Sequence, residues 1–142
     1  MEEGITGSYI LYKDGYRYQL ARDYIVALPH AAGEIVETRY LALSNAGVLT
    51  IRAGYAWDGP SGPTIDTRDA LRASLVHDAC YQLIRLGYLP AAYREIADDL
   101  LYRLAVEDGM LKIRAWCWKQ ALRLFGGKNA RPSREKPVLM AP

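Results

Sequence analysis

The 142-residue chain has a formal net charge of +2 and a hydrophobic content of 51%. This length is that of one ordinary domain, and the composition excludes a largely disordered chain. Four basic residues and one acidic residue lie within 128–142, so the rest of the chain is close to neutral. A duplex-binding surface needs clustered Lys and Arg side chains, and we therefore expect no nucleic-acid partner.

The first segment, MEEGITGSY, is acidic and polar, and no uninterrupted apolar run is as long as the roughly 18 residues of a membrane span. The sequence therefore predicts neither a secretory signal nor a transmembrane segment, and we expect the protein in a cytoplasm. Its two cysteines, Cys80 and Cys117, lie in different predicted helices. We expect both to be reduced and to act as small core residues.

Residues 9–57 are rich in Tyr, Val, Ile and Thr with loose alternation, as in YRYQLARDYIVAL and VLTIRAGYAW. This pattern is typical of β-strands. Turn-forming residues separate the apolar runs at Asp14-Gly15 and at 45–47, and residues 29–33 form a longer connection. The simplest interpretation is an antiparallel β-meander.

After Asp66 the apolar period becomes helical, and glycines mark where three predicted helices end. The helices span roughly 68–86, 91–108 and 110–125, and the glycines are Gly87, Gly109 and the pair 126–127. The fold class predicted is α+β: an N-terminal antiparallel β-meander, a Gly/Pro loop and three α-helices. We expect a single α+β domain over 1–127 and an extended or disordered basic tail over 128–142.

The loop between the two halves, GYAWDGPSGPTID, holds three glycines and two prolines among its polar residues. Glycine allows turns that aim backbone groups at one point and proline stiffens them, a combination found where a loop wraps an ion or anion. The alternative is a plain connector between sheet and helices.

Titratable residues interrupt the apolar rows of the first helix in SLVHDACYQL. Tyr81 lies four residues after His77, hence on its side of the helix, and the second helix carries adjacent carboxylates at Asp98 and Asp99. A short connection makes the two helices antiparallel neighbours, which can bring one carboxylate to His77. Such a pair can make imidazole a general base, or it can be a buried histidine with a purely structural partner.

The segments WDGPSG, ID, SLVHDACYQL and ADDLL together resemble the active-site region of secreted, bacterial and parvoviral phospholipases A2. In that family a glycine-bearing loop precedes a helix with H-D-x-x-Y and a second helix with an aspartate. The layout from Ala53 to the third helix also resembles a family of small proteins of tailed phages and prophages, which implies no particular activity. On that resemblance we expect the host cytoplasm, or association with a virion, as the location.

The phospholipase resemblance implies a lipid esterase in which His77 activates water and Tyr81 and Asp98 orient it. Asp98 fits the motif of a small residue, Asp, two residues and an apolar residue better than Asp99 does, although helix angles leave both open. The implied cofactor is calcium, with the ligands Asp78, Asp58, Gly59 and Gly62. The sequence departs from the secreted enzymes in lacking their disulfides and in carrying Pro60 and Pro63 in the loop. Because calcium is scarce in a reducing cytoplasm, another divalent cation held by Asp58, His77, Asp78 and Asp98 is an alternative.

The third helix, MLKIRAWCWKQALRLF, interleaves basic residues with large apolar ones. It either packs on the sheet by its aromatic side or lies on a lipid or membrane surface. Two functions therefore remain: a cation-dependent esterase resembling phospholipase A2, and a non-catalytic phage structural or accessory protein, with virion proteins as partners, in which the His-Asp cluster is structural. A metal-dependent phosphohydrolase is a weaker third, because it would need more histidines.

Overall fold

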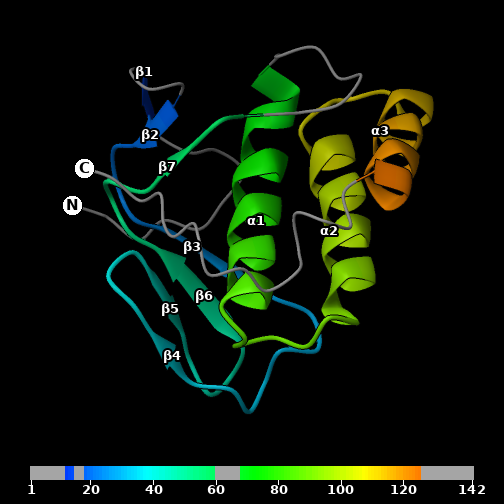
Figure 1. The fold of residues 1–142 in the computed structure, drawn as a ribbon. Helices are drawn as coiled ribbons and strands as arrows, with labels where there is room; N and C mark the ends of the chain where they lie inside the picture. Colours follow the sequence, from blue (N-terminus) through cyan, green and yellow to red (C-terminus); the bar gives the residue numbers. More distant parts are fainter. Residues whose placement is uncertain (1–11, 15–17, 60–67, 126–142) are drawn as a thin grey trace. The chain divides into compact units, whose positions relative to one another are not determined.

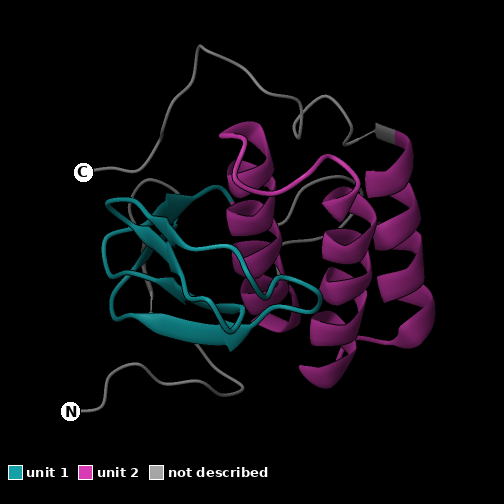
Figure 2. Cartoon of the chain, turned by 90° about the horizontal axis from the view of Figure 1, so that it is seen from below, with its two compact units in different colours: residues 1–58, 135–142 teal, residues 59–134 magenta. Residues whose placement is uncertain are grey.

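The computed structural model describes residues 12–14, 18–59 and 68–125. The chain divides into two compact units, with the described residues up to Asp58 in unit 1 and those from Gly59 in unit 2 (Figure 2). Small antiparallel sheets come first and three helices follow, so the predicted α+β class is confirmed. The single domain over 1–127 stays a prediction, and the basic tail over 128–142 lies outside the described residues.

Unit 1 contains the strands, which are short and antiparallel. Their bounds are β1 Tyr12–Asp14, β2 Tyr18–Leu20, β3 Tyr24–Ala27, β4 Val36–Glu37, β5 Leu41–Leu43, β6 Val48–Ile51 and β7 Ala56–Trp57. In β5 and β6 every second residue is buried, namely Leu41, Leu43, Leu49 and Ile51. The alternation read from the sequence thus corresponds to one buried face of a sheet.

The strands form two sheets, with the orders β1-β2-β7 and β3-β6-β5-β4. The predicted antiparallel pairing is confirmed, but the strands do not form one meander: β1 with β2 and β4 with β5 and β6 pair in chain order, whereas β2 pairs with β7 and β3 with β6. Alternation indicates where strands lie, but the pairing of strands depends on contacts between residues far apart in the sequence.

The predicted turn at 45–47 is present: Gly47 has φ +84°, and the Ser44 N–H donates to the Val48 carbonyl at 2.9 Å.

Unit 2 consists of α1 (Arg68–Arg85), α2 (Tyr93–Glu107) and α3 (Lys112–Phe125). The glycines predicted to end the first two helices do so. Gly87 has φ +85°, and the Tyr88 N–H reaches the Leu83 carbonyl at 2.9 Å; Gly109 has φ +106°, and the Met110 N–H reaches the Ala105 carbonyl at 3.0 Å. These left-handed glycines close each helix with the bonds of a Schellman motif.

The three helices lie side by side, with α2 between α1 and α3, and successive helices run in opposite directions (Figure 1). The apolar rows predicted on α1 are buried: Leu71, Leu75, Ala79 and Leu83, with Val76, Cys80 and Ile84. The apolar stripe of α2 consists of Ala97, Leu100, Leu101 and Leu104, which are buried, and of the half-buried Ile96. The helical periodicity therefore located the core of unit 2 correctly.

α3 packs against α2, and its buried residues are Ala115, Trp118 and Leu122. Ile113 and Trp116 are exposed. Because Trp116 and Trp118 lie on opposite sides of a helix, only one of them can face α2.

The two cysteines have different environments. Both are free thiols, but Cys80 is buried and Cys117 is exposed, so the expectation that both are core residues is wrong for Cys117. Burial raises the pKa of the Cys80 thiol to about 12, and the charges of Asp78 and Asp98 act in the same direction.

Among the described residues, no helix is both long enough and apolar enough to cross a membrane.

Candidate functional site

The polar cluster predicted on α1 and α2 lies wholly within unit 2. His77 and Tyr81 are one helical turn apart on α1, and their rings are in contact with centroids 4.1 Å apart. Asp98 lies on α2, which runs antiparallel to α1 and packs against it. His77 and Tyr81 are neighbours because of their spacing along α1, whereas Asp98 lies beside them because α2 packs against α1.

Two donors of α1 converge on one carboxylate oxygen of α2. His77 Nε2 lies 2.7 Å from Asp98 Oδ1, and the Tyr81 hydroxyl donates to the same oxygen at 2.7 Å. The neighbouring carboxylate, Asp99, is exposed and pairs instead with Lys119 Nζ at 3.0 Å. The structure thus brings His77, Tyr81 and Asp98 together and leaves Asp99 outside the cluster.

Asp98 is fully buried, with 0% of its side chain exposed. Its second oxygen, Oδ2, has no hydrogen-bond partner among the described residues. Burial weakens the screening of the carboxylate charge, so the electrostatic influence of Asp98 on the two donors is strong. A positive charge that forms on the His77 ring is therefore stabilised by a close and poorly solvated anion.

His77 keeps a small exposed surface, with 10% of its side chain accessible. Among the described residues its ring makes no hydrogen bond other than the one from Nε2 to Asp98. A neutral imidazole beside a carboxylate presents its N–H to that carboxylate, which leaves the lone pair on Nδ1. Nδ1 is then the ring nitrogen that is able to accept a proton.

Arg94 is a member of the cluster that the sequence reasoning missed. Its Nε donates to the Tyr81 hydroxyl at 3.3 Å, and its Nη2 donates to the carbonyls of Leu122 at 3.2 Å and Arg123 at 2.5 Å. The signal was available, since Arg94 lies four residues before Asp98 on the same side of α2. Through Arg94 the cluster is joined to the last carbonyls of α3.

The environment of Tyr81 favours its neutral form. Burial raises the pKa of its hydroxyl, and the hydrogen bond to Asp98 and the charge of that carboxylate raise it further, while Arg94 partly opposes them. The phenol therefore remains a donor to Asp98 throughout the neutral range. This contribution to stability is complete below the ordinary tyrosine pKa of about 10 and is lost as the pH rises through the higher pKa of the folded state.

Tyr81→Phe should reveal this dependence as a pH-dependent loss of stability. At pH 7 we expect the variant to be less stable than the parent by about 1.5–3 kcal/mol, the usual contribution of a hydrogen bond to a charged group. Above pH 10 the gap should narrow, because only the parent then loses stability through this phenol. Urea unfolding between pH 7 and 11 measures the free energy of unfolding of the parent and of the variant, and Tyr88→Phe, at an exposed position, serves as the control. A difference in stability that does not change with pH would contradict the expectation.

The residues predicted to hold calcium are less well defined. Asp78 on α1 is half-buried, Asp58 is exposed at the end of unit 1, and Gly59 has φ +85°. Gly62 lies outside the described residues. Within 12–14, 18–59 and 68–125, no three His, Cys, Asp or Glu side chains form a group that could hold a metal ion. The described residues thus supply no side-chain set for calcium, and its site stays a prediction.

The arrangement has the parts of a general base: an imidazole with one nitrogen bonded to a buried carboxylate, a second donor that orients the carboxylate, and some access to solvent. Comparison with known proteins does not identify the chain. No protein-family model, no curated protein and no solved structure matches it. The function is therefore inferred from the cluster itself and from its motif.

Proposed function

We propose that the chain is a small esterase of lipids, resembling phospholipase A2, in which His77 activates water. The observation that carries the proposal is the contact of 2.7 Å between His77 Nε2 and Asp98 Oδ1, with Tyr81 as second donor to the same oxygen. It is the grouping that the H-D-x-x-Y motif implies for this enzyme class, and it leaves Nδ1 as the basic nitrogen. In this proposal His77 is the catalytic residue, and Asp98 and Tyr81 are positioning residues.

The proposed reaction is direct hydrolysis without an acyl-enzyme. Water attacks the carbonyl carbon of the ester while His77 Nδ1 removes one of its protons. Asp98 holds the ring and stabilises the imidazolium that forms. The bond between the carbonyl carbon and the alcohol oxygen then breaks, the imidazolium returns the proton to the departing alkoxide, and a fatty acid and an alcohol are released.

Calcium is the cation that the resemblance implies, and it would polarise the ester carbonyl. No group of three or more His, Cys, Asp or Glu side chains among the described residues could hold this cation. The proton transfers of the proposed reaction use only His77 and Asp98. Asp78, half-buried and next to His77 in the sequence, is the carboxylate on which a cation requirement can be tested. Asp78→Asn should raise the calcium concentration that half-maximal activity requires, with a smaller effect on folding.

The test is fatty-acid release from phospholipid vesicles of mixed acyl chains, measured with calcium and with a chelator. The parent should release fatty acid in calcium, and His77→Gln should abolish the release while its circular dichroism is unchanged. His30→Gln, which alters the other and exposed histidine, is the matched control and should keep the parent rate. Absence of release by the parent in every condition, or equal release by His77→Gln, would refute the proposal.

A second candidate is the non-catalytic phage structural or accessory protein. The network that joins His77, Asp98, Tyr81 and Arg94 links α1 to α2 and α2 to α3, as a purely structural cluster would. In that case His77→Gln only lowers the free energy of unfolding, by about 1–3 kcal/mol, as is typical of an unsatisfied buried group. Fatty-acid release by the parent separates the two candidates, because the second candidate releases none in any condition.

A further inference from the structure

One face of α3 exposes the large apolar side chains of Ile113, Trp116 and Leu124, which together with the exposed Cys117 are here called the α3 stripe. Ile113 is 66% exposed, Trp116 49% and Leu124 74%, and Leu111, just before the helix, is 71% exposed. Positions three, four and eleven residues apart lie on one side of a helix. Single exposed apolar residues are ordinary, but several large ones on one helical face mark an interaction surface.

Among the described residues of unit 2, the packing of α3 uses a different face of the helix. α3 packs against α2 with its other side, where Ala115, Trp118 and Leu122 are buried. Near its C-terminus, the carbonyls of Leu122 and Arg123 accept hydrogen bonds from Arg94 of α2. The apolar residues of the α3 stripe are therefore additional to those that hold the helix in place.

The charges of α3 are all positive. The helix contains Lys112, Arg114, Lys119 and Arg123 and no acidic residue. Lys112, Lys119 and Arg123 lie along the flank of the stripe beside Trp116, at helical spacings of three, four and seven residues. Lys112 is exposed, and Lys119 and Arg123 make contacts with Asp99 at 3.0 Å and Glu95 at 3.9 Å. The surface thus combines apolar side chains with one exposed lysine, Lys112, and with two cations whose charges are partly offset by carboxylates of α2.

This combination disfavours a second copy of the chain as the occupant. A two-fold contact through the α3 stripe with antiparallel helices would place Lys112 opposite Arg123 of the other copy. Like charges across an interface cost binding energy. An anionic lipid surface instead accepts the apolar residues among its acyl chains and attracts the cations to its headgroups.

We propose that the α3 stripe is the surface by which the protein docks on an anionic phospholipid bilayer. Trp116, Ile113 and Leu124 enter the boundary between headgroups and acyl chains, and Lys112 lies at the level of the phosphates. Trp116 suits that boundary because its indole has an apolar body and a polar N–H. Docking is independent of the chemistry proposed for His77, although it would present a lipid esterase to its substrate.

The test is co-sedimentation of the full chain with vesicles of phosphatidylglycerol or phosphatidylcholine, in chelator so that hydrolysis and calcium bridging do not interfere. The parent should bind phosphatidylglycerol vesicles, bind phosphatidylcholine at least about tenfold more weakly, and be released by high salt. Ile113→Ser combined with Leu124→Ser should weaken binding by at least about tenfold, and Lys112→Glu by about tenfold. These positions are exposed, so the folded state should persist, as circular dichroism will check.

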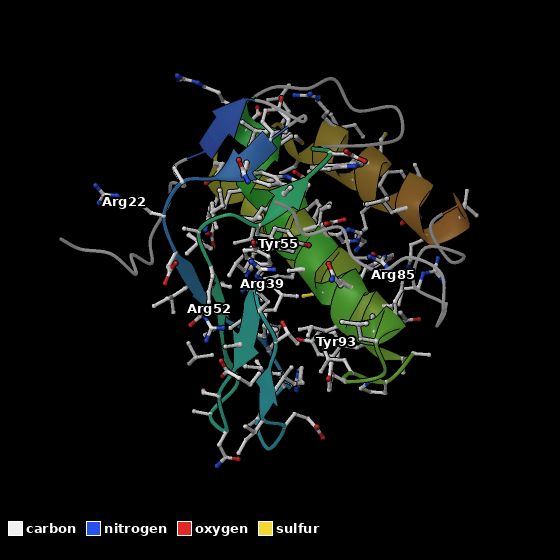
Figure 3. The ribbon with its side chains drawn as sticks, turned by 60° about the vertical axis from the view of Figure 1, so that its left-hand side comes forward. Arg22, Arg39, Arg52, Tyr55, Arg85 and Tyr93 are labelled. Atoms are coloured by element: carbon white, nitrogen blue, oxygen red, sulfur yellow. The ribbon has the colours of Figure 1, made fainter. Side chains whose placement is uncertain are left out.

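Matched controls exist in unit 1. Ile35 is 72% exposed, and Arg22 is exposed with its side chain projecting away from the ribbon (Figure 3). Ile35→Ser and Arg22→Glu should bind vesicles as the parent does. Three results would overturn the proposal: no binding to phosphatidylglycerol at low salt, equal binding by the double serine variant, or a concentration-dependent dimer in sedimentation that the serine substitutions abolish. His77→Gln should still bind, so failed hydrolysis with intact docking would count against the esterase alone.

Discussion

Asp98→Asn is expected to lower the rate constant of ester hydrolysis by about 10²- to 10⁴-fold while leaving the fold intact. Asparagine has the shape of aspartate, and an amide oxygen in the place of Oδ1 can still accept the hydrogen bonds from Tyr81 and His77, so little stability should be lost. It has no negative charge, so the imidazolium that forms when His77 takes a proton from water is no longer stabilised by a close anion.

Two measurements check this expectation. Initial rates of fatty-acid release give the loss of activity, and ¹⁵N chemical shifts of the histidine rings check that Nε2 of His77 still carries the proton. Asp99→Asn is the matched control, because this exposed neighbour pairs with Lys119 and not with His77. A parent-like rate in folded Asp98→Asn would show that the charge of the carboxylate does not assist His77.

Arg72→Met should cause a large loss of stability. The guanidinium of Arg72, on the second turn of α1, contacts Asp108 through two bonds of 2.8 and 3.0 Å and Glu107 through one of 3.1 Å. Only 6% of the Arg72 side chain and 10% of the Asp108 side chain are exposed. Removing one partner leaves a nearly buried carboxylate without its cation, and we expect the free energy of unfolding to fall by about 3–5 kcal/mol.

Urea unfolding at pH 7 measures this loss, and Arg103→Met provides the control. Arg103 approaches the same Glu107 at 4.0 Å but is 58% exposed, so its removal should cost less than about 1 kcal/mol. Combining Arg72→Met with Asp108→Asn should recover part of the stability, because the nearly buried carboxylate that lost its cation is then neutral. Similar losses for Arg72→Met and Arg103→Met would mean that the ion pair at the end of α2 is not a stabilising feature.

Much of the candidate site could be predicted because its α1 half is local. His77 and Tyr81 share one side of a helix by their spacing of four residues, and the short connection after Gly87 makes α1 and α2 neighbours. The choice between Asp98 and Asp99 needed the structure, since successive residues lie 100° apart and each flanks the packing stripe. Arg94 was missed because its hydrogen bond to Tyr81 joins two different helices.

For the strands, too, the sequence predicted the features that depend on neighbouring residues and missed those that depend on distant ones. Periodicity and turn residues located the β-rich region and the turn at Gly47, because these depend on neighbouring residues. The pairing of β3 with β6 and of β2 with β7 joins segments more than twenty residues apart. No local pattern specifies such partners, and a meander was the simplest arrangement compatible with the sequence.

The sequence by itself determined the α+β class, the ends of the first two helices and the buried rows of α1, because helix periodicity and left-handed glycines act within a few residues. Only the tertiary structure decided which carboxylate contacts His77 and which tryptophan of α3 is buried. Trp116 and Trp118 are chemically the same, and packing on α2 alone distinguishes the core residue from the exposed one. Side chains acquire these roles from partners distant in the chain, where sequence patterns carry little information.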